Sequence, residues 1–226
     1  MADPTTATDQ AGPSIFLASR NGKKIEEMRR ILAEHVPGVV VLGLDDVAAY
    51  DEPVEDQPTF EGNALLKAMA GVSATGLPSV ADDSGLCVGA LNGMPGVLSA
   101  RWAGVAKDDA ANNRLLLEQL ADVPDERRDA EFRCAVAFCL PDGAVRVVPG
   151  AMTGRVVREP RGAGGFGYDV LFVPDDQPVD GAGVGASTGA GDLTAAEMTP
   201  EAKDAVSHRG RALRAIAPEI AALLRA

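Results

Sequence analysis

Short apolar runs alternate along the chain with segments of helical periodicity. The runs 14–19 (SIFLAS) and 39–44 (VVVLGL) have the length and composition of buried strands. Between them, residues 23–35 repeat apolar side chains every three or four positions, which predicts an amphipathic helix. The same spacing predicts further helices over 59–73 and 108–120 and from about Ser207 onward.

A further strand and a hairpin complete this pattern. The run 77–81 (LPSVA) predicts a buried strand that ends at Asp82 and Asp83. Residues 131–140 (EFRCAVAFCL) predict another strand, PDG a tight turn, and VRVVPGAMTGRVV the returning strand. Strands that alternate with helices, together with one hairpin, predict an α/β fold in which helices flank a mixed, twisted β-sheet.

Composition limits the compartment and the classes of partner. The 226 residues suffice for one large core, so we expect a single domain over 14–226 after a disordered leader at 1–13. The net charge of −12 argues against nucleic-acid binding, which needs a basic field over the phosphates. Three cysteines without a CxxC spacing predict reduced thiols and a cytoplasmic protein.

Two further features of the sequence concern membranes and mobile segments. No apolar run reaches the roughly 18 residues of a transmembrane helix, so we expect no membrane contact. The stretch 180–192 (DGAGVGASTGAGD) is too poor in large apolar side chains to offset its ordering entropy, which predicts a flexible surface insertion.

Two polar clusters point to phosphate and metal chemistry. SRNGKK, at 19–24, joins a predicted strand to a predicted helix, where backbone N–H groups and lysines can bind an anion; a solvated turn is the alternative. Asp82 and Asp83 come directly before Ser84 and Gly85 at the expected end of a buried strand. Paired carboxylates there suit Mg²⁺ held jointly with substrate phosphates, and a helix cap or turn is the alternative.

Two other clusters point to a flat, polar ligand. In RGAGGFGYDVLF, at 161–172, glycines permit close backbone approach while Phe166 and Tyr168 can stack on a ring; a loop that closes a hairpin is the alternative. Lys203 and the adjacent pair His208–Arg209 supply cationic groups that could equally cap a helix. The four clusters together contain the parts needed to hold a nucleoside polyphosphate with Mg²⁺.

Eight segments in order carry a family resemblance. They are ASRNGKKIEE, TFEGNALLKA, ADDSGL, GMPGVLSARWAG, FRCAVAF, GGFGYDVLF, AEM and SHRGRAL, all between residues 15 and 214. On these segments the chain resembles the inosine/xanthosine triphosphate pyrophosphatase (RdgB-like) family, which acts on noncanonical purine nucleotides. The resemblance implies Mg²⁺-dependent hydrolysis of ITP, dITP or XTP to the monophosphate and pyrophosphate. It also implies an elongated fold with two lobes around a central substrate cleft, and a homodimer.

The resemblance also implies roles for individual residues. Asp83 would be the catalytic base or a Mg²⁺ ligand, with Glu55 and Asp82 joining the metal site. The residues expected to bind substrate are Ser19, Arg20, Asn21, Gly22, Lys23, Lys24, Ser84, Phe166, Gly167, Tyr168, Asp169, Lys203, His208 and Arg209.

Four positions depart from the family pattern, and two other functions are open. The family usually has Gly at Arg20, Glu at Gly62, Asp at Gly89 and Pro at Val170. Gly62 bears on the arrangement of acids around the metal. A Maf-like pyrophosphatase of modified pyrimidine nucleotides, or a nucleotide-binding module without catalysis, would use similar parts.

Overall fold

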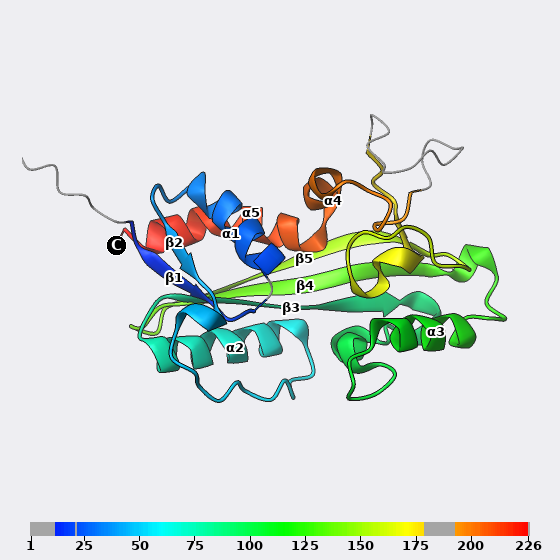
Figure 1. Cartoon of the computed structure of the whole chain (residues 1–226), viewed down its shortest axis with the longest axis horizontal. Helices are drawn as coiled ribbons and strands as arrows, with labels where there is room; N and C mark the ends of the chain where they lie inside the picture. Colours follow the sequence, from blue (N-terminus) through cyan, green and yellow to red (C-terminus); the bar gives the residue numbers. More distant parts are fainter. Residues whose placement is uncertain (1–11, 21, 179–192, 226) are drawn as a thin grey trace, which may run out of the picture.

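One mixed sheet with helices on both faces forms the framework of the chain (Figure 1). The computed structural model describes residues 12–20, 22–178 and 193–225. Within these residues the sheet has six strands in the order β2-β1-β3-β4-β5-β6. The strands are β1 Ser14–Leu17, β2 Val40–Leu42, β3 Ser79–Val88, β4 Asp129–Cys139, β5 Val145–Val156 and β6 Phe172–Pro174. The helices are α1 Gly22–Ala33, α2 Phe60–Thr75, α3 Asp109–Gln119, α4 Pro200–Val206 and α5 His208–Leu223.

The sheet is parallel on one side of β3 and antiparallel on the other. β1 pairs in parallel with β2 and β3, while β3–β4, β4–β5 and β5–β6 are antiparallel. The expected α/β class, the mixed sheet and the 131–157 hairpin are therefore confirmed. The leader falls mostly, and the 180–192 insertion wholly, outside the described residues.

Helix positions follow from local capping and from apolar faces. The Thr59 and Asp108 side chains accept hydrogen bonds from Gly62 N and Ala111 N, which starts α2 and α3 where the sequence predicts helices. α1 and α5 pack on one face of the sheet around Val80 and Val136, whereas α2 packs on the other around Ala81 and Ala135. None of the helices in the described residues is long and apolar enough to cross a membrane.

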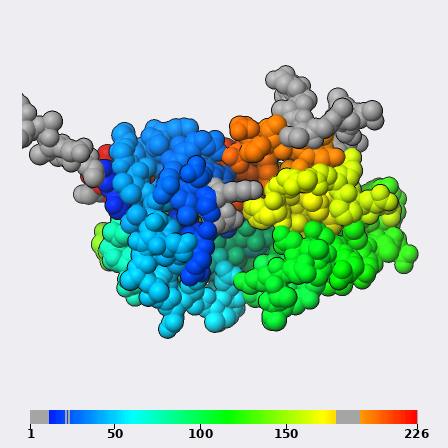
Figure 2. All heavy atoms as spheres, viewed as in Figure 1, coloured from blue at the N-terminus to red at the C-terminus, as the bar shows by residue number. Residues whose placement is uncertain are grey.

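Strand β3 corrects one expectation from the sequence. Asp82 and Asp83 were expected where a strand ends, but β3 continues through both acids to Val88. All ten of its residues pair in register with β4, which supplies the hydrogen-bond partners that let the strand run through a polar segment. In the space-filling view, β3 is visible at the base of a depression between the blue and cyan N-terminal part and the yellow and green segments (Figure 2).

Candidate active site

The pleat of β3 separates its two adjacent acids. Successive side chains of a strand point to opposite faces of the sheet. Asp82 contacts Lys24 of α1 and Arg209 of α5, while Asp83 contacts Asn63 and Lys67 of α2. Two neighbouring carboxylates thus have different partners, one set from α1 and α5 and the other from α2.

On the α2 face, Asp83 belongs to a compact polar group. Its Oδ2 atom accepts a hydrogen bond from Asn63 Nδ2 at 3.0 Å, and its Oδ1 atom lies 3.4 Å from Lys67 Nζ. The same ammonium is 2.7 Å from Glu55 Oε1. Lys67 therefore lies between two carboxylates that approach it from a strand and from the loop before α2.

Burial controls the electrostatics of this group. The Asp83 side chain is only 12% exposed. Burial raises the pKa of Asp83 above its ordinary value, and the opposing effects of Lys67 and Asn63 reduce this shift without cancelling it. Burial would also raise the pKa of Glu55, but the Lys67 ammonium outweighs it and holds that pKa below its ordinary value. The two carboxylates are thus shifted in opposite directions from their ordinary pKa values.

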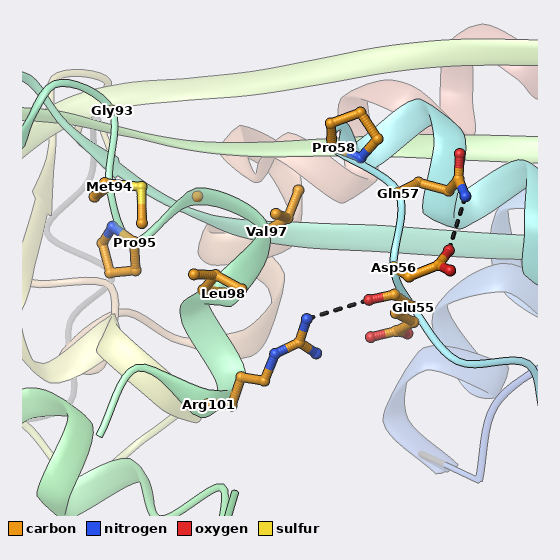
Figure 3. A pocket seen from close by; sticks show the side chains of 11 residues that line it. Glu55, Asp56, Gln57, Pro58, Gly93, Met94, Pro95, Val97, Leu98 and Arg101 are labelled. Atoms are coloured by element: carbon orange, nitrogen blue, oxygen red, sulfur yellow. Dashed lines mark hydrogen bonds between the residues drawn. The ribbon is translucent and has the colours of Figure 1, made fainter. Parts of the chain in front are cut away.

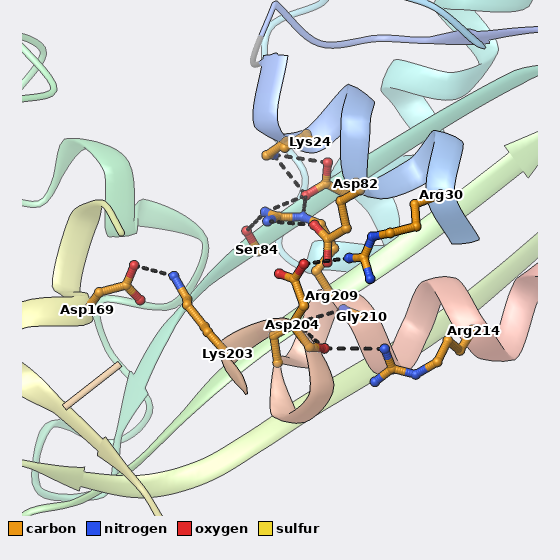
Figure 4. A network of polar contacts seen from close by, with 12 residues as sticks. Lys24, Arg30, Asp82, Ser84, Asp169, Lys203, Asp204, Arg209, Gly210 and Arg214 are labelled. Carbon is orange, nitrogen blue, oxygen red and sulfur yellow. Dashed lines mark hydrogen bonds and ion pairs between the residues drawn. The ribbon is translucent and has the colours of Figure 1, made fainter. Parts of the chain in front are cut away.

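On the opposite face, Asp82 pairs with two cations (Figure 4). Its two oxygens lie 3.0 and 2.9 Å from Lys24 Nζ, and Oδ2 accepts a hydrogen bond from Arg209 Nε at 3.1 Å. Burial alone would raise the pKa of Asp82, but Arg209 and Lys24 together hold it well below its usual range. In the part of the chain that the structure describes, Asp82, Asp83 and Glu55 do not form one group that could hold a metal ion.

Hydrogen bonds and an ion pair fix the segment 166–169 in place. Asp169 Oδ2 accepts the Phe166 N–H at 2.8 Å and also pairs with the Lys203 ammonium. Lys203 Nζ in turn lies 5.1 Å from the centre of the Phe166 ring, which is 48% exposed. Tyr168 is buried and donates its hydroxyl to Ser99 O at 2.9 Å. Of the two aromatic residues expected to stack, Phe166 is exposed and Tyr168 is buried, so stacking on a ligand ring stays a prediction for Phe166 alone.

His208 is the buried histidine at the start of α5. Its ring stacks on Phe132 with centres 5.1 Å apart, and its Nδ1 atom has no hydrogen-bond partner among the described residues. Burial, reinforced by Arg209 and Lys203, lowers the pKa of His208 well below its ordinary value. The imidazole is therefore neutral at pH 7.

The predicted phosphate-binding turn leads into α1. α1 begins at Gly22, so its first backbone N–H groups follow directly on Ser19 and Arg20. Arg20 is exposed and pairs with Glu52, which joins the turn to the acidic segment before α2. Asn21 and the side chain of Lys23 lie outside what the structure describes, while Lys24 lies beside β3 and pairs with Asp82.

A hollow lies beside Glu55 (Figure 3). The loop before α2 lines one side, from Glu55 to Pro58, and the loop Gly93–Leu98 with Arg101 lines the other. Arg101 donates to the backbone oxygen of Glu55 at 3.1 Å, which fixes the loop that carries this acid.

The family follows from a match over most of the chain. The profile of the Ham1 family matches residues 15–219. The chain belongs to the Ham1 family. A Ham1 relative from Nocardia farcinica, described as a dITP/XTP pyrophosphatase, is 59% identical over 210 residues, covering 92% of this chain and 95% of the relative. Another of that description, from Mycolicibacterium paratuberculosis, is 56% identical over 213 residues, covering 94% and 98%.

Solved structures agree with this assignment. A dITP/XTP pyrophosphatase from Mycobacterium abscessus is 53% identical, covers 91% of this Ham1 chain and 99% of its own, and has a TM-score of 0.70. The Ham1 protein of Staphylococcus aureus is 34% identical with a TM-score of 0.76, covering 93% and 99%.

Two residues of this Ham1 site were missed in the sequence. Asn63 and Lys67 lie on α2 and reach Asp83, but they were taken only as parts of a helix. Their spacing of four residues puts both on one face of α2, and a polar pair on an apolar helix face was the available signal.

Asp83 and Glu55 offer two carboxylates, which suits Mg²⁺ bound jointly with phosphate oxygens. Among the described residues no group of three or more metal-binding side chains forms a cage by itself.

Proposed function

We propose that this Ham1 protein is a Mg²⁺-dependent pyrophosphatase that converts dITP, ITP and XTP to the nucleoside monophosphate and pyrophosphate. The observation that carries the proposal is the buried Asp83 carboxylate beside Lys67 and Glu55 on one face of β3. The description of the Nocardia and Mycolicibacterium relatives as dITP/XTP pyrophosphatases supports the substrate class.

Asp83 and Glu55 would hold the metal. Both are carboxylates in one polar group, and hard oxygen donors of this kind bind Mg²⁺ with substrate phosphates completing its coordination. When bound, Mg²⁺ would neutralise charge on the phosphate oxygens.

The side chains of the protein would then position water and phosphate. Asp83 would orient or deprotonate the water that attacks the α-phosphorus as pyrophosphate leaves. Lys67 would hold Asp83 in place and stabilise negative charge, and Lys24 would contact the triphosphate near the start of α1.

The base would be selected at the far end of the site. Phe166 offers an exposed ring for stacking, and Arg209 is a permanent donor suited to the 6-carbonyl of hypoxanthine or xanthine. His208 is neutral and has an unpartnered Nδ1, so it adds a polar group without a positive charge. Adenine presents an amino donor at that position, which would face the N–H groups of Arg209 instead of accepting from them. The family resemblance leads us to expect a homodimer, and the reduced cysteines lead us to expect a cytoplasmic protein.

The test is pyrophosphate release from dITP, ITP, XTP, dGTP, ATP and dTTP, with Mg²⁺ and with EDTA. We expect strong, Mg²⁺-dependent preference for the first three nucleotides, and loss of turnover in Asp83→Asn. A preference for pyrimidine nucleotides would instead indicate the Maf-like activity. No release from any nucleotide, with binding retained, would indicate a binding module.

A further inference from the structure

Helix α3 holds both backbone polar groups of Gly167. The Asp109 carboxylate accepts the Gly167 N–H at 2.8 Å. One turn further along the helix, Asn113 Nδ2 donates to the Gly167 carbonyl oxygen at 2.9 Å. Gly167 has a φ of +60°, in the left-handed region, and follows Phe166 directly. Two side chains of one rigid element therefore fix the peptide next to the exposed aromatic ring.

We propose that Asp109 and Asn113 are positioning residues that set the Phe166 ring for the purine base. The inference rests on the proposed function, which places the base against Phe166. Both residues would act through the backbone of Gly167.

The hydrogen bonds that join Asp109 and Asn113 to Gly167, here called the clamp, are not explained by a need to satisfy buried backbone groups. The bond between Asp109 and Gly167 lies at an exposed position, where water could accept the same N–H. Asn113 leaves its Oδ1 atom buried without a hydrogen-bond partner among the described residues, which costs stability. A residue retained for packing alone would avoid that cost, whereas one needed to hold the Gly167 carbonyl must accept it.

The clamp connects the base end of the site to the core. Leu116 of α3 is fully buried and anchors the helix. The Asn112 side chain anchors it as well, because it donates to Ala100 O at 3.1 Å and accepts from Ala103 N at 2.7 Å. Ser99 in the preceding turn bonds Leu86 N on β3 at 2.9 Å and accepts the Tyr168 hydroxyl at its carbonyl. Phe166 is thereby held relative to the strand that carries Asp83.

The experiment compares Asp109→Ala, Asn113→Ala and the double variant with wild type, using dITP and dGTP with Mg²⁺. Loss of a contact that acts equally in the ground and transition states should raise KM and spare kcat. We expect KM for dITP to rise about tenfold in Asp109→Ala, as for the loss of one charge-assisted hydrogen bond, while kcat changes less than about threefold. The double variant should lose less than the product of the single losses, because both side chains hold one residue.

Two matched variants separate positioning from helix stability. Asp108→Ala removes the α3 cap, since Asp108 accepts Ala111 N at 3.1 Å, yet leaves the Gly167 contacts intact. It should leave KM near wild type. Asp109→Asn keeps an acceptor and should restore most of the loss. Equal KM changes in Asp108→Ala and Asp109→Ala, or an unchanged KM in Asp109→Ala, would overturn the proposal.

Hydrogen exchange measured by mass spectrometry over residues 163–171 tests the clamp without turnover. Exchange should speed up in Asp109→Ala and not in Asp108→Ala, with exchange in β4 as the check that the fold is intact. If wild type releases no pyrophosphate from dITP, the proposed function fails and this measurement alone decides. Unchanged exchange in Asp109→Ala would then refute the clamp.

Discussion

Asp82→Asn should mainly lower stability, whereas Asp83→Asn should mainly lower turnover. Both substitutions keep the side-chain volume and remove one charge from adjacent positions of β3. Asp82 is 5% exposed and lies within 3.1 Å of both Lys24 and Arg209. Asp82→Asn therefore leaves two cations near the core without their shared anion.

The magnitude for Asp82 follows from the burial of its partners. Removing one partner of a buried ion pair costs about 3–5 kcal/mol. Lys24 keeps 21% of its side chain exposed, so solvent offsets part of the loss. We expect Asp82→Asn to lower the free energy of unfolding by about 3 kcal/mol, which corresponds to roughly 6–12 °C in Tm for a chain of this size.

The expectation for Asp83 has a different physical basis. Burial already disfavours its charged form and raises its pKa, so a neutral amide removes a cost as well as the Lys67 contact at 3.4 Å. Lys67 retains Glu55 at 2.7 Å. Stability should stay within about 1 kcal/mol of wild type, while turnover falls by about 10²-fold or more because the base is lost.

The midpoint and slope of urea unfolding at pH 7 give the free energy of unfolding of both variants. Pyrophosphate release is measured on the same samples. Loss of stability in Asp83→Asn equal to or greater than that in Asp82→Asn would refute the assignment of the two acids to separate faces. Near-normal turnover in Asp83→Asn would refute its catalytic role.

Three further predictions concern other parts of the site and the core. Lys67→Met should lower turnover by about 10²-fold, because it removes the cation between Glu55 and Asp83; pyrophosphate release checks this, and a loss below about threefold would contradict it. Folding lowers the pKa of His208, so below about pH 6.5 the unfolded chain binds more protons than the folded protein. The free energy of unfolding should therefore decrease as the pH is lowered through this range, by up to about 1.4 kcal/mol per pH unit. Urea titrations should show a smaller decrease in His208→Gln. Arg128 is 2% exposed and donates hydrogen bonds to the carbonyl oxygens of Leu120, Val156 and Val157. Arg128→Met should therefore lower the free energy of unfolding in urea by about 3 kcal/mol and leave turnover unchanged. As the control, Arg158→Ala removes an exposed arginine and should cost under about 1 kcal/mol.

Local patterns predicted much of the framework. Periodicity located α1, α2 and α3 to within a few residues, and the PDG turn located the β4–β5 hairpin. These features depend on neighbours in sequence, so a single sequence contains them. The end of β3 was misjudged because an acidic pair followed by Ser and Gly has the composition of a turn, while pairing with β4 depends on a distant segment.

The partners of the acids could not be predicted for the same reason. Asp82 meets Lys24 and Arg209, which are 58 and 127 positions away. A strand shifted by one residue would exchange the faces of both acids, and composition does not reveal that register. Lys67 was within reach of sequence analysis, because it is a polar residue on the apolar face of a predicted helix, four residues from Asn63.

The placement of the two acids on β3 explains how neighbouring carboxylates acquire different chemistry. Two carboxylates on one face would share their surroundings, and their repulsion would raise one pKa at the expense of the other. On opposite faces, Asp82 is held ionised by Arg209 and Lys24, whereas Asp83 is made more basic by burial. Environments that drive two pKa values apart separate a structural anion from a proton acceptor. One strand register thus positions Asp82 against the cations of α1 and α5 and the proposed base, Asp83, against α2, and both placements depend on the same pairing with β4.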